Sequence, residues 1–278
     1  MLRCMTSAIA GLKANMTGLD VTGNNVSNVN TDAFKSSSVG FRDSMYQELS
    51  SGSASGSAAG INPSQIGYGA TASSVDVNTT KGGQDATGDQ SNIYINGSGY
   101  LVISNKNAGV TSADLKYTRL GKLGTDSGGY LTDGDGNFVC NATTADGSTT
   151  FTPIKLTIVS GKPITDLSIG SDGKITYNNG SGTQQTAGPI SLAVFPNAAG
   201  LQQAGGSCYN AAANAGTPVY VQPGDNGSNT LVPGALEGSN VDLATEFSNM
   251  IMYERGYQAN TKIVTVADEC LQTLVNMK

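Results

Sequence analysis

The chain has 278 residues, a net charge of −6 and neither histidine nor tryptophan. Only 13% of its residues are charged and they form no basic cluster, which argues against nucleic acid as a partner, because phosphates need Lys or Arg. Without histidine, Ser-His-Asp and Cys-His catalysis and the commonest transition-metal ligand are excluded, so we expect no enzyme, no cofactor and no metal site.

A helix is predicted over residues 3–28, where apolar residues recur at alternating steps of three and four. This spacing places them on one stripe, the seam that coiled coils bury. Gly11, Gly18 and Gly23 each weaken the helix by up to about 1 kcal/mol relative to Ala, so packing must supply most of its stability. Two alternatives stay open: the helix orders only on assembly, or it packs on its own domain.

The composition of the sequence changes between Asn24 and Thr31, where Asn and Ser are frequent. Their side chains compete for backbone hydrogen bonds and predict the end of this helix. Residues 36–65 are expected to be a linker. Within them, residues 50–60 consist mostly of Ser, Gly and Ala, a composition typical of a flexible or extended connector.

The region 66–235 predicts a mainly antiparallel β-domain. Asn96-Gly97 stands between two apolar runs and predicts a hairpin, because both residues accept positive φ. Asp172-Gly173 predicts a second hairpin turn. Further strands are predicted at Lys116–Arg119, Gly136–Cys140, Ile154–Ile158, Lys174–Tyr177, Ile190–Phe195 and Val219–Gln222.

The segment Asp133-Gly-Asp-Gly-Asn137 resembles the opening of a calcium loop. Thr144 stands where such a loop needs a carboxylate, so we interpret the segment as a turn. The cysteines lack the spacing of a metal site and favour free thiols or late cross-links over a disulfide framework. They are Cys4, Cys140, Cys208 and Cys270.

A second long helix is predicted over residues 241–276, with Asn240 as its cap and with Asp242 and Glu246 near its positive N-terminal end. A helix of this length overhangs a compact β-domain, so we expect it to pack on the N-terminal helix and on neighbouring subunits. Its apolar stripe is Tyr253, Tyr257, Asn260, Val264, Ala267, Leu271 and Leu274.

Polar residues interrupt the apolar residues near the start, so a cleavable signal peptide is not expected. The chain also lacks a run of roughly 20 apolar residues, so we expect no insertion into a membrane.

Motifs at both ends are specific enough to compare with a known family. The first is Leu19-Asp-Val-Thr-Gly-Asn-Asn-Val-Ser-Asn-Val-Asn-Thr31 with Phe34-Lys35, and the last is Gly234-Ala-Leu-Glu-Gly-Ser-Asn-Val-Asp-Leu-Ala. Between them lie Ile95-Asn-Gly-Ser-Gly-Tyr-Leu-Val102 and Tyr117-Thr-Arg119. Together they resemble the signatures of the bacterial flagellar axial proteins, the family of rod and hook subunits.

The resemblance is nearest to hook subunits, through Asn62-Pro-Ser-Gln-Ile-Gly67 and Arg255-Gly-Tyr-Gln-Ala-Asn260. It implies a structural subunit of the flagellar hook, which polymerises into a curved helical tube and transmits torque from rod to filament. A distal rod subunit is the alternative, because residues 138–190 leave little room for the outer β-domain that many hook subunits carry. An unrelated secreted β-protein, such as an adhesin or a carbohydrate-active enzyme, would not explain heptads at both ends.

The implied fold is α+β, with long coiled-coil-forming helices at both ends. The implied domains are a helical inner-tube domain of residues 1–35 and 236–278, the linker 36–65 and a β-rich outer domain of residues 66–235. The implied partners are further copies of the chain, the distal rod, hook cap and hook–filament junction proteins, and the flagellar export apparatus, with a place in the extracellular hook. The expected assembly residues are Leu2, Met5, Ile9, Leu12, Met16, Leu19, Phe247, Met250, Tyr257, Val264, Leu271 and Leu274.

Overall fold

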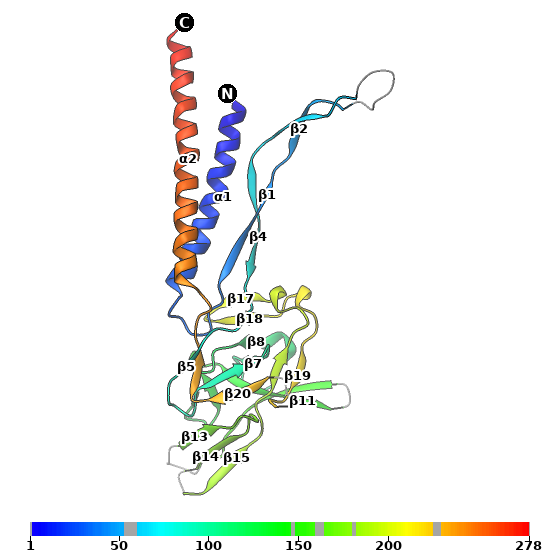
Figure 1. The fold of residues 1–278 in the computed structure, drawn as a ribbon. Helices are drawn as coiled ribbons and strands as arrows, with labels where there is room; N and C mark the ends of the chain where they lie inside the picture. The colour runs from blue at the N-terminus through cyan, green and yellow to red at the C-terminus, as the bar shows by residue number, and fades with distance from the viewer. Residues whose placement is uncertain are drawn as a thin grey trace. The chain divides into compact units, whose positions relative to one another are not determined.

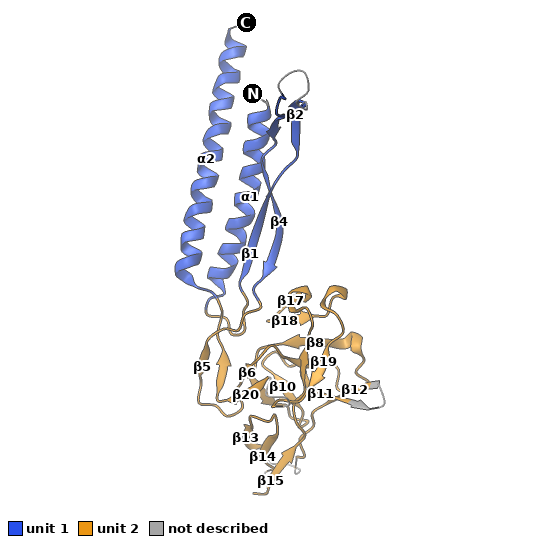
Figure 2. Ribbon diagram, turned by 45° about the vertical axis from the view of Figure 1, so that its right-hand side comes forward, with its two compact units in different colours: residues 1–29, 36–78, 241–278 blue, residues 30–35, 79–240 orange. Residues whose placement is uncertain are grey.

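The computed structural model describes residues 2–52, 60–145, 148–158, 164–179, 182–224 and 229–277. The chain divides into two compact units (Figure 2). Unit 1 comprises residues 1–29, 36–78 and 241–278, and unit 2 comprises residues 30–35 and 79–240. Most of the Ser/Gly-rich stretch that was expected to be a connector, residues 53–59, lies outside the described residues.

Unit 1 is built on two antiparallel helices, α1 (Leu2–Ser27) and α2 (Leu243–Asn276), which confirm both predicted helices (Figure 1). Small residues let the helices approach closely. Gly11 lies against Asn260 and Gly18 against the ring of Tyr253, while Gly256 of α2 lies against Asn15. Each step forward along α1 is matched by an equal step back along α2, which fixes the register of the pair.

The cap of α2 differs from the expectation. Asp242, not Asn240, is the N-cap, and its carboxylate accepts a hydrogen bond of 3.1 Å from the Ala244 amide. The Asn240 side chain instead donates to the backbone carbonyl of Thr80 at 3.2 Å. A charged cap suits the positive end of the helix dipole better than a neutral one.

A long β-ribbon accompanies the helices where a linker was expected over residues 36–65. Strand β1 (Ser37–Asp43) pairs with β4 (Ala70–Val77), and β2 (Tyr46–Ser50) pairs with β3 (Ser64–Gly67). The ribbon packs on α1, where the Cα of Gly69 lies so close that an added Cβ would be 3.1 Å from the Ser7 carbonyl. Residues 37–43 and 46–50 are thus ladder-paired strand and not connector.

Unit 2 is a β-domain in which the described strands all pair antiparallel, as predicted. Its main sheet has the order β17-β18-β8-β7-β11-β10-β9, with β12 on β11, β16 on β7 and β19 on β16. Smaller sheets are β13-β14-β15, β6-β20 and β5-β21. The bounds are β5 (Gln84–Ala86), β6 (Ile93–Asn96), β7 (Tyr100–Ser104), β8 (Leu115–Thr118), β9 (Leu123–Thr125), β10 (Leu131–Asp133), β11 (Phe138–Ala145), β12 (Ser148–Pro153), β13 (Thr165–Ile169), β14 (Ile175–Asn178), β15 (Gln184–Ala187), β16 (Leu192–Val194), β17 (Gln202–Gly205), β18 (Cys208–Asn210), β19 (Val219–Val221), β20 (Thr230–Pro233) and β21 (Ala235–Glu237).

The core of unit 2 lies on both faces of β7. Leu101 and Ile103 belong to an aliphatic cluster, whereas Tyr100 and Val102 belong to a second cluster rich in aromatic rings. Alternate residues of a strand point to opposite faces, so a strand that is buried on both sides has an unbroken apolar run. The run from Tyr100 to Ile103 therefore marks β7 as the centre of the sheet.

Two strand predictions are wrong. β6 and β7 do not form the hairpin expected around Asn96-Gly97, because β6 pairs with β20 and β7 pairs with β8, β11 and β16. Neither Asn96 nor Gly97 has a positive φ, and the carbonyls of this turn accept hydrogen bonds from a buried side chain described below. The segment Ile154–Ile158 forms no strand: it has one isolated bridge, Tyr130–Lys155, and is held by single backbone hydrogen bonds, such as that from the Leu156 amide to the Gly129 carbonyl at 2.7 Å.

The glycines of α1 generate a test of the helix contact. In Gly23→Ala the new Cβ meets nothing within 4 Å, so we expect α1 to gain up to about 1 kcal/mol of helix propensity. In Gly18→Leu the propensity gain is similar, but the Cβ lies 3.0 Å from the Tyr253 ring and overpacking costs about 1–3 kcal/mol. Thermal unfolding followed by far-UV circular dichroism should give shifts of opposite sign. Equal gains in both variants would show that α1 and α2 do not pack through Gly18.

Candidate assembly surface

The face that α1 turns toward α2 is not the predicted apolar stripe of this helix. That stripe consists of Leu2, Met5, Ile9, Leu12, Met16 and Leu19. The buried residues on this side are small or polar, and they are Ala8, Gly18, Thr22 and Asn25. The predicted stripe has the same period but lies on a neighbouring face. Ile9 is 40% exposed and Met16 is 55% exposed, while Met5, Leu12 and Leu19 are half-buried. The side chain of Leu2 lies outside what the structure describes.

On α2 the predicted stripe divides between two environments. Ala267 is buried, and Tyr253, Asn260, Val264 and Leu271 are half-buried on the side of α1. The other expected residues are less covered: Phe247, Tyr257 and Leu274 are exposed and Met250 is half-buried. The structure therefore brings part of each predicted stripe into the chain's own helix pair and leaves the remainder on the surface.

Asn25 joins three elements of unit 1. Its amide donates to the Ser37 carbonyl at 2.8 Å and to the Glu246 carboxylate at 3.0 Å, and its side-chain oxygen accepts from the Ser37 amide at 3.0 Å. Burial raises the pKa of Glu246, although the hydrogen bond from Asn25 opposes this and the charge of Asp242 adds to it. One Asn of the N-terminal motif thus ties α1 to β1 and to α2.

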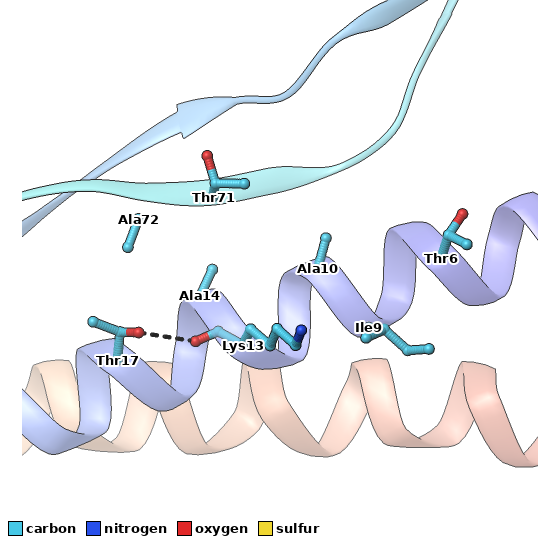
Figure 3. A pocket seen from close by; sticks show the side chains of 8 residues that line it. All are labelled: Thr6, Ile9, Ala10, Lys13, Ala14, Thr17, Thr71 and Ala72. Atoms are coloured by element: carbon cyan, nitrogen blue, oxygen red, sulfur yellow. Dashed lines mark hydrogen bonds between the residues drawn. The ribbon is translucent and has the colours of Figure 1, made fainter.

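A groove of about 360 Å³ runs between α1 and β4 (Figure 3). Small and apolar side chains make most of its wall, and Lys13 brings a positive charge to its rim. Such a lining holds no acid–base or nucleophilic pair and suits packing of an apolar group. The lining residues are Thr6, Ile9, Ala10, Lys13, Ala14, Thr17, Thr71 and Ala72.

A buried charge network in unit 2 was not predicted from the sequence. The Glu237 carboxylate accepts from the Lys35 ammonium at 2.5 Å through one oxygen and from Nε of Arg119 at 2.7 Å through the other. The side chains of all three residues are almost fully buried. The Gly82 amide also donates to the carboxylate, at 2.9 Å.

Backbone carbonyls satisfy the remaining donors of the two cations. The Arg119 guanidinium donates to the carbonyls of Ile95, Gly97 and Gly99, at 3.3, 2.8 and 3.2 Å, and Lys35 donates to the Thr80 carbonyl at 2.7 Å. Every buried side-chain nitrogen and oxygen of the described residues has a partner. The network is therefore complete, which buried charges require.

The Glu237 carboxylate pairs with two cations, Lys35 and Arg119, and these charges shift the pKa values of Glu237 and Lys35. Burial by itself would raise the pKa of Glu237, but the charges and hydrogen bonds of Arg119 and Lys35 outweigh it and hold the pKa below 4.5. Burial lowers the pKa of Lys35, the hydrogen bond and charge of Glu237 oppose this, and the nearby Arg119 charge lowers it further. Glu237 is the group on which the ionised network depends.

The sequence did contain a signal for this network. Lys35, Arg119 and Glu237 each end or follow an apolar or aromatic motif, Phe34-Lys35, Tyr117-Thr-Arg119 and Leu236-Glu237, in a chain with few charges. Gly97 and Gly99 belong to the same set of motifs. What the sequence lacks is any indication that segments 202 residues apart meet.

The acidic turn at Asp133 has a structural explanation. Oδ1 of Asp133 accepts from the backbone amides of Asp135 and Asn137, at 2.8 and 3.1 Å, and Gly136 has a φ of +83°. These bonds confirm a turn between β10 and β11. Asp135 and Cys208 lie nearby, but the Cys208 thiol donates to the Gly206 carbonyl and burial raises its pKa, so it does not offer a thiolate.

Glu237→Gln tests the network. The substitution preserves size but leaves Lys35 and Arg119 buried without a counter-charge, so we expect the free energy of unfolding of unit 2 to fall by about 3–5 kcal/mol. Urea unfolding followed through the near-UV signal of the core tyrosines measures it. Lys174→Gln, which breaks the exposed Lys174–Asp172 pair, is the control and should cost less than about 1 kcal/mol. Similar losses in the two variants would contradict a special role for Glu237.

The lowered pKa of Glu237 also predicts a pH dependence. A carboxyl group whose pKa is depressed by folding stabilises the folded state fully above its unfolded pKa of 4.5, and this contribution is lost as the pH falls through the folded value. The unfolding free energy of the parent chain should therefore drop on acidification below about pH 4.5 more steeply than that of Glu237→Gln. Parallel pH profiles of the two proteins would refute this.

Within the described residues, no helix is long and apolar enough to span a membrane.

Comparison with known proteins identifies the family. Residues 232–277 match the model "Flagellar basal body rod FlgEFG protein C-terminal", and residues 94–177 match "Flagellar hook protein FlgE/F/G D1 domain". The chain is 40% identical to the flagellar basal-body rod protein FlgG of Bacillus subtilis and 30% identical to that of Caulobacter vibrioides, over the full length of all chains. It is 22% identical to the flagellar hook protein FlgE of Borreliella burgdorferi, in an alignment of 447 positions. These relatives are structural proteins and not enzymes, and the chain belongs to the FlgE/F/G family of flagellar rod and hook proteins.

Proposed function

We propose that the chain is a structural subunit of the distal rod of the flagellar basal body. The observation that supports this proposal is the length of the chain. The chain aligns from end to end with FlgG proteins over 280 and 281 positions, with little insertion. The alignment to a hook protein needs 447 positions, so a hook subunit of that kind carries a large part that this chain lacks. The motifs that favoured the hook are therefore outweighed, and the rod alternative is preferred.

Assembly through the two helices fits this proposal. Exposed apolar residues on a monomer indicate an interaction surface when they form a contiguous patch. Ile9 and Met16 on α1, and Phe247, Tyr257 and Leu274 on α2, are exposed apolar residues of the single chain and are proposed contact residues. Repeated heterologous contacts between such faces generate an open helical array and not a closed ring when the rotation does not close.

The proposed partners follow from this position in the basal body. They are copies of the chain itself, the neighbouring rod and hook subunits and the flagellar export apparatus. The proposed domain division keeps the helical segments 1–35 and 236–278 toward the tube axis and the β-rich region 66–235 outside them. The ribbon β1–β4 lies within unit 1, so we place it with the helices, and the outer region then begins at residue 79 and not at residue 66.

Immunogold labelling of isolated hook–basal bodies tests the proposal. Antibodies against unit 2 should label the rod between the basal-body rings and the hook, and the curved hook should stay unlabelled. Antibodies against the organism's hook subunit, used on the same particles, give the matched control. Label along the hook would overturn the rod assignment and restore the hook reading.

A further inference from the structure

Residues 30–35 follow α1 in the sequence and precede β1, yet they belong to unit 2 (Figure 2). Their neighbours in the chain, residues 1–29 and 36–78, both belong to unit 1. The chain therefore leaves unit 1 after α1, packs a short segment on the β-domain and returns to unit 1 at β1. We call residues 30–35 the docking segment.

Several hydrogen bonds fasten the docking segment, and two of them end on Glu237. The Ala33 amide donates to the backbone carbonyl of Glu237 at 2.7 Å, and the Lys35 ammonium donates to its carboxylate at 2.5 Å. The Ser207 hydroxyl also donates to the backbone carbonyl of Asp32, at 3.1 Å. Glu237 thus holds the docking segment through both its main chain and its side chain.

Other features weaken this docking. Ala33 has a φ of +59°, in the left-handed region that is unfavourable for a residue with a Cβ. A cleft of about 400 Å³ lies beside residues 30–32, so the start of the segment is not closely packed. Lys35 and Arg119 share one carboxylate, so docking buries an unbalanced positive charge.

The rest of the buried network is complete without the docking segment. When Lys35 is removed, the Glu237 carboxylate still accepts from Nε of Arg119 and from the Gly82 amide, at 2.7 and 2.9 Å. The guanidinium keeps its three backbone carbonyls. What remains is a neutral, hydrogen-bonded ion pair, whereas removal of Glu237 leaves two buried cations without a counter-charge. Lys35 is therefore the separable member of the network.

We propose that the docking segment opens from unit 2 as a local unit while the rest of the β-domain stays folded. Segments with few buried apolar contacts open at lower free energy than core strands. Of residues 30–35, all of which the structure describes, Ala33 is the one apolar residue that is fully buried. Closed, the segment joins the chain after α1 to unit 2, and open, it removes that link and leaves the β-sheet intact. This is a property of the single chain, so it applies to a rod or a hook subunit alike.

Amide hydrogen exchange of the full chain tests the inference. After correction for intrinsic rates, the Ala33 amide should exchange at least about tenfold faster than the amides of β7. Low concentrations of urea should leave the Ala33 rate unchanged, because local opening exposes little surface, and should raise the β7 rates. Exchange of Ala33 at the rate of β7, with the same urea dependence, would show that the segment leaves only when unit 2 unfolds, and would overturn the inference.

Ala33→Pro removes the docking. Proline lacks the N–H group that donates to Glu237 and fixes φ near about −65°, which is incompatible with the φ of +59°. We expect the other amides of residues 30–35 to exchange at unprotected rates, while the urea midpoint of unit 2, followed through its tyrosines, stays close to that of the parent chain.

Glu237→Gln is the matched variant, because it removes the counter-charge from both cations and should lower the urea midpoint of unit 2. A fall in Ala33→Pro as large as that in Glu237→Gln, or failure of Ala33→Pro to fold, would show that the docking segment is an integral part of the β-domain. Either result would overturn the inference and leave the proposed function untouched.

Discussion

The structure depends on one buried carboxylate. Glu237 lies just before α2 in sequence, Lys35 just after α1, and Arg119 follows the central strands of unit 2. A buried ion network gives little net stability compared with apolar packing, but it tolerates no substitute partner, because any unpaired charge is costly. We infer that the role of this network is to specify which segments of unit 2 meet, those that carry Lys35, Arg119 and Glu237. The chain segments that lead into both helices are held at one point of the β-domain.

The helix contact follows a different principle. Gly11, Gly18 and Gly256 lower helix propensity, and in return they let the backbones approach and admit Asn260, Tyr253 and Asn15 between the helices. A seam of small and polar residues buries little apolar area, so it stabilises the isolated pair only modestly. The larger apolar residues, Ile9 and Met16 among them, stay on the outside, where another helix can cover them.

Periodicity predicted the helices and many strands, because local spacing determines which element a segment forms. It could not tell which face of α1 turns inward, since the stripe of Ala8 and Gly18 and the stripe of Ile9 and Met16 repeat identically. The hairpin prediction at Asn96-Gly97 is wrong for a related reason. Its carbonyls accept from Arg119, a contact between segments 22 residues apart that no local rule contains. Strands β1 and β2 of the ribbon were not predicted from the sequence, because they contain many polar residues and are mostly exposed.

The proposed choice of the rod over the hook sets chain length against short motifs. Arg255 donates to Gln258 at 3.1 Å, and Gln258 donates to Glu254 at 2.8 Å, all on the exposed side of α2. These residues satisfy one another along the helix, so the motif that they form is explained by contacts within α2. Chain length is the stronger criterion, because the alignments with two rod proteins span 280 and 281 positions, whereas the alignment with a hook protein spans 447.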